Sequence, residues 1–320
     1  MSPSKYAAVS AGGDGHLPFV EKHLDEPLIV IDPGKIIRGT PLSYRLVGNA
    51  FEAFYDNSPL TGISAVWYRK PELALPADEP HKRGYDEFTR HAMSLFMRQL
   101  YGLLPNALWV SNYYAMLRAS DKLWQLTVAH RLGLKIPDTL VTSNAAEAEQ
   151  FVRSHTGAIV KPIEVKVFTL DGKQRMMLTQ KVNKRKMSFS GLHLAPAMIQ
   201  EAIEVATDIR VTVVGNKVFA ATVAPKSANM TPAGVRDWRA GDHYGGTIIQ
   251  AFELPASIAR ACVLHVKEMG LKYGGIDLLL DREDNFWFLE NNPNGQWAFI
   301  EEATGQPIGK AIAKLLMTGK

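Results

Sequence analysis

The 320-residue sequence contains a single cysteine, Cys262, and lacks several short motifs that mark common enzyme classes. One cysteine excludes an internal disulfide and a cysteine-based zinc site. There is no G-x-x-x-x-G-K-[ST] run, which excludes a P-loop, and neither H-E-x-x-H nor G-x-S-x-G is present to support a zinc protease or a hydrolase elbow. The glycines between Gly12 and Gly15 do not fit G-x-G-x-x-G, so only a tight turn is expected there.

Long apolar runs and a strong charge of one sign are also missing. No stretch approaches the roughly 20 apolar residues that span a membrane, and the first residues do not form a secretory signal. We therefore expect a cytoplasmic protein with no membrane contact. The formal charge of +4 is too small to indicate nucleic-acid binding, although it suits anionic ligands.

The order of periodic segments predicts an α/β (α+β) protein of two or three domains. Strands at 6–11, 28–32 and 64–68, with a helix at 18–24, indicate a small N-terminal α/β domain. The further expected elements are helices at 87–104, 121–132 (capped by Ser120), 144–153, 255–271 and from Pro307, strands at 108–110, 139–142, 158–162 and 197–203, and hairpins about Asp171-Gly172 and Gly215-Asn216.

The stretch from Tyr273 to Trp297 carries the main candidate site. Pairing Asp281 with Phe286 in a hairpin would place Asp277 directly opposite Glu290, on one face with Asn292. Side chains opposed in this way lie roughly 4.5–5.5 Å apart at Cβ, where two like charges repel. A divalent cation would remove that repulsion, and two carboxylates with an amide oxygen suit Mg²⁺. The alternative is a solvated hairpin with two acids at its rim.

Other polar groups point to a nucleoside triphosphate. Lys122 stands in the first turn of a helix, where the helix dipole disfavours a cation, and Lys161 stands inside an apolar strand, where a lysine needs an anionic partner. Asp208 and Arg210 share one face of a strand. The long loop 225–246 adds the cations Lys226, Arg236 and Arg239. Cations around a magnesium site are typical of a nucleotide triphosphate site.

Six spaced motifs in residues 116–320 resemble the ATP-grasp superfamily: SDK ending at Lys122, IVKP around Lys161, IQEAI ending at Ile203, DIR ending at Arg210, IDL around Asp277 and ENNP from Glu290. The runs VWYRKP (66–71), NPNGQW (292–297) and IEEATGQPI (300–308) resemble more narrowly the microviridin-type, or graspetide, peptide ligases. From the residues alone, Arg69 and Lys70 in the first run would contact an anion or form a solvated strand end.

The resemblance implies an ATP-grasp fold in three parts: an N-terminal domain (1–115), a central domain with a peptide-docking hairpin (116–198) and a C-terminal domain with the Mg·ATP site (199–320). It implies ATP and Mg²⁺ as cofactors. The residues that it assigns are Lys122 and Lys161 for phosphates, the backbone of Glu201 and Ile203 for adenine, Asp208 for ribose, Asp277, Glu290 and Asn292 for Mg²⁺, Arg210, Arg239 and Lys226 for the reacting phosphate, and Lys173 and Arg175 for the peptide.

The implied reaction activates an Asp or Glu side chain of a ribosomally made precursor peptide as an acyl phosphate, which a Ser or Thr hydroxyl or a Lys amine then attacks. The implied partners are a precursor with a leader and an acidic core, and a second copy of this chain. Two departures from the family stand out: Ile163–Phe168 contains no glycine, and Gly275 stands where many relatives carry a cation. A glutamate-adding (RimK-like) ligase and a catalytically silent nucleotide-binding regulator are the alternatives.

Overall fold

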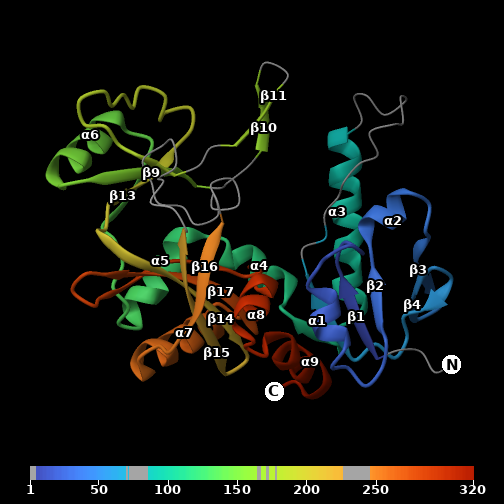
Figure 1. Ribbon diagram of the computed structural model, residues 1–320. Helices are drawn as coiled ribbons and strands as arrows, with labels where there is room; N and C mark the ends of the chain where they lie inside the picture. Colours follow the sequence, from blue (N-terminus) through green and yellow to red (C-terminus); the bar gives the residue numbers. More distant parts are fainter. Residues whose placement is uncertain are drawn as a thin grey trace.

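The computed structural model describes residues 5–69, 71, 86–163, 167–170, 173–176, 179–225 and 246–320. Within these ranges the chain is an α/β protein whose strands and helices form three successive groups (Figure 1). The predicted fold class is confirmed. Among the described helices, none combines the length and the apolar character needed to cross a membrane.

The first group is built on a parallel sheet in the order β2–β1–β6–β7. The sequence predicted this α/β unit but not the antiparallel sheet β3–β4–β5 beside it, whose outer ends are exposed. The elements are β1 (Tyr6–Val9), α1 (Leu17–Glu21), β2 (Leu28–Ile31), α2 (Pro33–Ile37), β3 (Leu42–Val47), β4 (Ala50–Tyr55), β5 (Ser58–Pro59), β6 (Ala65–Tyr68), α3 (Asp86–Leu103) and β7 (Leu108–Val110).

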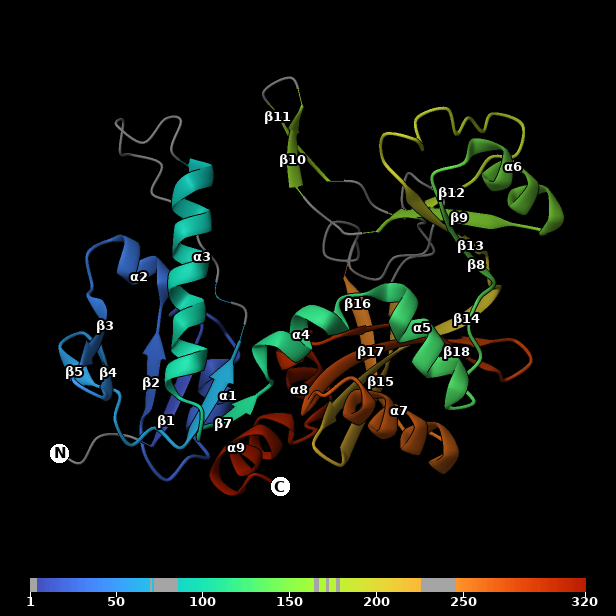
Figure 2. The same cartoon turned by 180° about the vertical axis from the view of Figure 1, so that it is seen from behind.

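The second group holds the sheet β12–β9–β13–β8, against which α6 packs through Ala148 and Val152. The strands β10 and β11 pair on their own, with Leu170 opposite Lys173, and project away from the sheets in both views (Figures 1 and 2). The elements are α4 (Tyr113–Ala119), α5 (Lys122–Arg131), β8 (Thr139–Thr142), α6 (Ala145–Ser154), β9 (Ala158–Pro162), β10 (Val167–Leu170), β11 (Lys173–Met176), β12 (Gln180–Lys181) and β13 (Ala197–Glu201).

The third group is an antiparallel sheet in the order β16–β15–β14–β17–β18. Ile209, Val211 and Val213 of β14 face α5 and α7, as the alternation predicted. On the opposite face, α8 and α9 form a core with residues of the N-terminal sheet. The elements are β14 (Val205–Val214), β15 (Lys217–Pro225), β16 (Thr247–Phe252), α7 (Ala256–Glu268), β17 (Tyr273–Asp281), β18 (Phe286–Asn292), α8 (Ala298–Thr304) and α9 (Ile308–Thr318).

One predicted helix start is wrong. Asp121, not Ser120, caps α5, since its side chain accepts a hydrogen bond from the backbone N–H of Trp124 at 3.3 Å. Ser120 instead ends α4, and its hydroxyl donates to Met116 O at 3.1 Å. The sequence pattern does not predict helix α4, and for that reason Ser120 was expected to begin the following helix. The correction leaves Lys122 in the first turn of α5.

Candidate active site

Three charged residues lie side by side on adjacent strands of the five-stranded sheet. Arg210 of β14 is opposite Asp277 of β17, and Asp277 is opposite Glu290 of β18. The predicted opposition of the two carboxylates is therefore confirmed. Asn292, two residues beyond Glu290, pairs with Gly275.

The predicted register at the hairpin turn is wrong. Phe286 pairs with Leu280 rather than Asp281, and a β-bulge at Leu289 restores the register before Glu290. The cause is the side chain of Asp281, which accepts hydrogen bonds within the turn rather than facing Phe286. Its donors are the backbone N–H groups of Glu283 and Asn285 and the indole of Trp287. Burial raises the pKa of Asp281, but these hydrogen bonds outweigh it and bring the pKa down to about 2.

A cation lies beside each of the opposed carboxylates. Arg210 Nη1 donates to Asp277 Oδ1 at 2.7 Å, and Lys122 Nζ lies 3.7 Å from Glu290 Oε2. Two cations therefore reduce the repulsion between the carboxylates, which was expected to be removed by a metal ion alone. The Arg210–Asp277 pair is the shorter and the more buried of the two, and the Arg210 side chain is 5% exposed. Lys122 and Glu290 are more open, at 17% and 27%, and their contact is longer.

Arg210 occupies space that two glycines leave open. A Cβ on Gly275 would lie 2.7 Å from Arg210 Nη2, and a Cβ on Gly295 would lie closer still. The guanidinium of Arg210, from the neighbouring strand, therefore lies beside Gly275, where the sequence has no cation of its own. Burial alone would lower the pKa of Arg210, but the charge of Asp277 raises it, so the guanidinium stays charged.

The oxygen donors at this position fit Mg²⁺. Asp277 and Glu290 offer carboxylate oxygens from facing strands, and Asn292 offers an amide oxygen next to them in the sheet. Asn292 Oδ1 also accepts a hydrogen bond from Asn294 N at 2.9 Å, which fixes the direction of the amide. The assignment of these three residues to a metal remains a prediction.

The nucleotide residues predicted from the sequence lie in three elements. Lys122 begins α5, half-buried Lys161 lies in β9 opposite Met198, and half-buried Asp208 lies in β14 opposite Leu279. Glu201 ends β13, and Ile203 lies in the short connection from β13 to β14, between two sheets. This placement fits a hinge, while the roles stay predictions.

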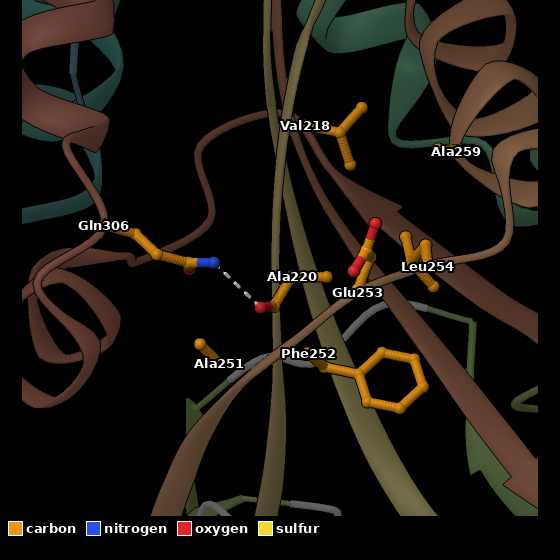
Figure 3. A pocket seen from close by; sticks show the side chains of 8 residues that line it. All are labelled: Val218, Ala220, Ala251, Phe252, Glu253, Leu254, Ala259 and Gln306. Carbon is orange, nitrogen blue, oxygen red and sulfur yellow. Dashed lines mark hydrogen bonds between the residues drawn. The ribbon is translucent and has the colours of Figure 1, made fainter.

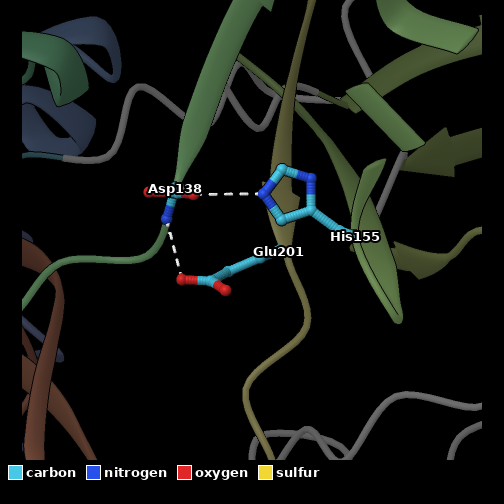
Figure 4. Close-up of side chains that lie close together, drawn as sticks. All are labelled: Asp138, His155 and Glu201. Carbon is cyan, nitrogen blue, oxygen red and sulfur yellow. Dashed lines mark hydrogen bonds and ion pairs between the residues drawn. The ribbon is translucent and has the colours of Figure 1, made fainter. Parts of the chain in front are cut away.

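Glu201 has a second, unpredicted setting. Its carboxylate accepts from Asp138 N at 3.0 Å, and Asp138 Oδ2 lies 3.1 Å from His155 Nε2 (Figure 4). One oxygen or nitrogen atom from each of these three side chains lies within 4.8 Å of the other two. His155 Nδ1 faces Phe151 O at 2.8 Å, so both ring nitrogens face acceptors. The contact with Phe151 O, and then that with Asp138, raises the pKa of His155 and favours an imidazolium–carboxylate pair.

Several predicted residues cannot be placed in this way. Lys226, Arg236 and Arg239, together with most of the long loop, lie outside the described residues. Lys173 and Arg175 belong to β11, for which the structure describes the backbone. Their roles stay predictions.

A hollow of about 460 Å³ lies at the opposite edge of the five-stranded sheet, away from β17 and β18 (Figure 3). Its lining comes from β15, β16, the start of α7 and Gln306, whose Nε2 donates to Ala220 O at 3.1 Å. Apolar side chains such as Phe252 and Leu254 dominate the lining, and Glu253 adds one carboxylate. It contains none of the residues predicted for ATP or Mg²⁺.

Sequence reasoning missed a buried ion pair next to the candidate site. One of the two interpretations of the sequence placed Arg69 at a solvated strand end. Arg69 is instead 2% exposed, and its Nε lies 3.2 Å from Asp14 Oδ2. Its Nη1 donates to Asn294 O at 2.6 Å, in the loop that follows Asn292. For Arg69 the solvated interpretation is wrong, and the anion is a side chain of the protein. Lys70 lies outside the described residues. The run VWYRKP drew attention to Arg69, but its partners Asp14 and Asn294 are distant in the sequence.

Residues 119–316 match the model of the RimK-like ATP-grasp domain. The chain belongs to the RimK-like ATP-grasp family. Enzymes of this family are ligases whose cofactors are ATP and Mg²⁺, so both predicted cofactors are confirmed at the level of the family. The resemblance stated from the six motifs is confirmed as well.

Curated relatives include proteins named probable alpha-L-glutamate ligase. The one from Vibrio atlanticus (strain LGP32) is 30% identical over 214 residues, which is 65% of this chain and 66% of that protein. The one from Marinomonas sp. (strain MWYL1) is 30% identical over 212 residues, or 64% and 65%. The match thus spans slightly less than two thirds of these relatives.

Similarity to solved structures covers almost the whole chain. A RiPP-associated ATP-grasp ligase of Chryseobacterium gregarium, in complex with ADP and a leader and core peptide, superposes with a TM-score of 0.85 at 26% identity, covering 99% of this chain and 97% of that one. The macrocyclase MdnC of Microcystis aeruginosa MRC, bound with precursor peptide MdnA, gives 0.81 at 24%, covering 98% and 99%. At 24% identity, the similarity to MdnC shows a shared fold alone.

Proposed function

We propose that this ATP-grasp ligase closes rings in a ribosomally made precursor peptide. The observation that carries the proposal is coverage: the likeness to the Chryseobacterium ligase includes the N-terminal part of the chain, whereas the match to the glutamate ligases covers 65% of it. That neighbour is in complex with a leader and core peptide, which supports a peptide substrate here. A cytoplasmic site of action and a homodimer are part of the proposal.

The proposed reaction has two steps. An oxygen of an Asp or Glu carboxylate in the peptide attacks the γ-phosphorus of ATP; the bond to the β,γ-bridging oxygen breaks, and ADP leaves. A Ser or Thr hydroxyl, or a Lys amine, then attacks the acyl carbon. Inorganic phosphate leaves, the nucleophile gives up its proton, and the peptide has lost the atoms of one water. Positioning and charge neutralisation suffice, so no enzyme nucleophile is needed.

The residues take roles that follow from their placement. Asp277, Glu290 and Asn292 would hold Mg²⁺, which when bound neutralises charge on the ATP phosphates. Lys122 would leave Glu290 for a phosphate oxygen, and Lys161 would provide the second phosphate contact. Arg210, held by Asp277, supplies fixed positive charge next to the metal ligands. Arg239 and Lys226 would face the reacting phosphate, and Asp208, Glu201 and Ile203 would bind the nucleoside.

The paired strands β10 and β11 are the proposed docking element for the precursor. They form a separate hairpin that projects from the sheets, and such strands can bind a peptide through backbone pairing (Figure 2). Lys173 and Arg175 would then favour an acidic peptide. The variant with both residues changed to Ser is expected to raise the KM for the peptide and to leave ATP affinity unchanged.

The test uses a short peptide with Thr or Ser and Asp or Glu repeats, with ATP and Mg²⁺. We expect the peptide mass to fall by one water per ring, with one ADP and one phosphate released each time. Hydroxylamine added during turnover should trap the activated side chain as a hydroxamate. A gain in mass from an added glutamate would favour the glutamate-ligase alternative. AMP and pyrophosphate would overturn the acyl-phosphate route, and no turnover with intact nucleotide binding would favour the regulator.

A further inference from the structure

Gln125 lies on α5, one turn after Lys122, and binds the backbone of the strand that carries the metal ligands. Its Oε1 accepts from Asn291 N at 2.8 Å, and its Nε2 donates to Asn291 O at 2.8 Å. β18 is an edge strand of its sheet, so these two backbone groups would otherwise have no strand beside them. The Gln125 side chain, 3% exposed, therefore takes the place of a neighbouring strand at one position.

That position lies between two predicted ligands. Asn291 is flanked by Glu290 and Asn292, whose side chains alternate to the face opposite its own. The same helix sends Lys122 to the Glu290 carboxylate at 3.7 Å. α5 thus contacts this strand twice, once at the backbone and once at a ligand side chain. A shift of the strand along α5 would break both contacts together.

His265 of α7 contacts both Gln125 and Asn291. Its Nε2 lies 3.1 Å from Gln125 O, and its Nδ1 lies 3.4 Å from Asn291 Nδ2. Burial lowers the pKa of His265, which keeps the ring neutral, so Nε2 donates to the carbonyl and Nδ1 accepts from the amide. The Asn291 side chain is tightly enclosed, because a Cβ on Gly274 would lie 2.6 Å from its Oδ1.

We propose that Gln125 is a positioning residue that fixes Glu290 and Asn292 for metal binding by clamping the backbone of Asn291. The inference rests on the proposed metal role of those two residues. Gln125 itself points to the backbone and away from the ligand face. Its effect is therefore on the geometry of the ligands, and its loss should weaken the metal more than the nucleotide. Residues that orient metal ligands typically contribute about 10–100-fold to metal affinity or activity.

The test measures Mn²⁺ binding to the protein with ADP by electron paramagnetic resonance, without any peptide. Gln125→Met keeps the approximate volume of the side chain and removes both hydrogen bonds to Asn291. It also removes the hydrogen bond that Gln125 Nε2 donates to Ala119 O at 2.5 Å. We expect the dissociation constant for Mn²⁺ to rise about 10–100-fold, while calorimetry shows metal-free ADP binding within about threefold of wild type. Gln125→Ala is the second variant if the first does not fold. The matched control is Gln306→Met, which removes an amide-to-backbone hydrogen bond at the far edge of the same sheet.

Two outcomes separate the inference from the site assignment. Glu290→Gln serves as the reference, because it removes a proposed ligand directly. If Glu290→Gln weakens Mn²⁺ binding and the folded Gln125 variants leave it unchanged, the positioning role is wrong. If Glu290→Gln also has no effect, the metal assignment itself is wrong. Equal weakening of metal-free ADP and Mn²⁺ would mean general loss of the site, and would overturn the inference as well.

Discussion

The backbone N–H of Trp297 donates a hydrogen bond to Nε2 of His16 across 3.1 Å, although the two residues are 281 positions apart. His16 is 7% exposed and Trp297 is fully buried. On the other side of the ring, His16 Nδ1 lies 2.6 Å from Asp14 Oδ1. The turn after β1 is therefore tied directly to the loop that follows β18. The N-terminal part of the chain thus helps to hold the loop that directly follows the predicted metal ligand Asn292.

Asp14 anchors this connection, and its removal should be costly. Burial raises the pKa of Asp14, but hydrogen bonds from His16 and the charge of Arg69 lower it to about 2. Because the folded pKa is depressed, the stability that Asp14 supplies is present above about pH 4 and is lost as the pH falls toward 2. At pH 7, Asp14→Asn should lower the free energy of unfolding by about 2–4 kcal/mol, since buried Arg69 loses its carboxylate.

Urea denaturation at pH 7, pH 4 and pH 2 measures this effect. Glu21→Gln, on the exposed side of α1, is the control and should change the free energy by less than about 0.5 kcal/mol. In wild type the stability should fall between pH 4 and pH 2 more steeply than in Asp14→Asn. Equal stability of the Asp14 variant and the control would show that the network is not an anchor.

The sequence was informative where a local period decides the structure. A strand period of two placed Asp277 and Glu290 on one face and put Ile209 and Val211 on the other. The bulge at Leu289 could not be foreseen, because it depends on the hydrogen bonds that Asp281 makes within its own turn.

Contacts between distant segments escaped the sequence analysis for a different reason. Arg69 binds a carbonyl 225 residues away, and no local pattern encodes that distance. The same holds for Arg210, which fills the space beside two glycines from separate segments. The resemblance implied that Arg210 faces the reacting phosphate, but only the pairing of β14 with β17 places its guanidinium beside Gly275 and Asp277.

Gly295 should tolerate no side chain, although its backbone does not need a left-handed conformation. A Cβ there would overlap Arg210 Nη2 and approach the Cα of Gly275 to 3.2 Å. We expect Gly295→Ala to lower the free energy of unfolding by about 1–3 kcal/mol and to weaken Mn²⁺ binding, because the guanidinium must move off Asp277. Gly191→Ala is the matched control, since no atom lies within 4 Å of the added Cβ. Equal thermal midpoints for the two variants would contradict the close approach.

The His155–Asp138 pair predicts a pH effect of known sign. The pKa of His155 is raised above its ordinary 6.5 by Phe151 O and Asp138. A raised folded pKa means that the pair stabilises fully below pH 6.5 and loses this contribution as the pH rises through the folded value. Thermal midpoints of wild type and His155→Gln should therefore differ more at pH 6 than at pH 9. The control is His193→Gln, an exposed histidine next to a loop. A difference independent of pH would show that His155 acts by packing on Phe151 alone.

Asp277→Asn and Glu290→Gln should both stop Mg²⁺-dependent ADP release, but for different structural reasons. Asp277 neutralises buried Arg210, so Asp277→Asn leaves that charge unpaired and should cost about 3–5 kcal/mol of stability. Glu290 faces the more open Lys122, and its neutralisation should cost less than about 1 kcal/mol. Glu290→Gln is therefore the cleaner test of the metal site. Wild-type turnover by this variant at saturating Mg²⁺ would refute the assignment.

A double-mutant cycle isolates the buried pair. Arg210→Met together with Asp277→Asn removes both charges and leaves an apolar chain between Gly275 and Gly295. We expect the double variant to be more stable than Asp277→Asn alone, because the uncompensated buried charge is gone. It should remain inactive, since one proposed ligand is missing. Additive losses of stability would mean that Arg210 and Asp277 do not depend on each other, and that the 2.7 Å contact contributes little to folding.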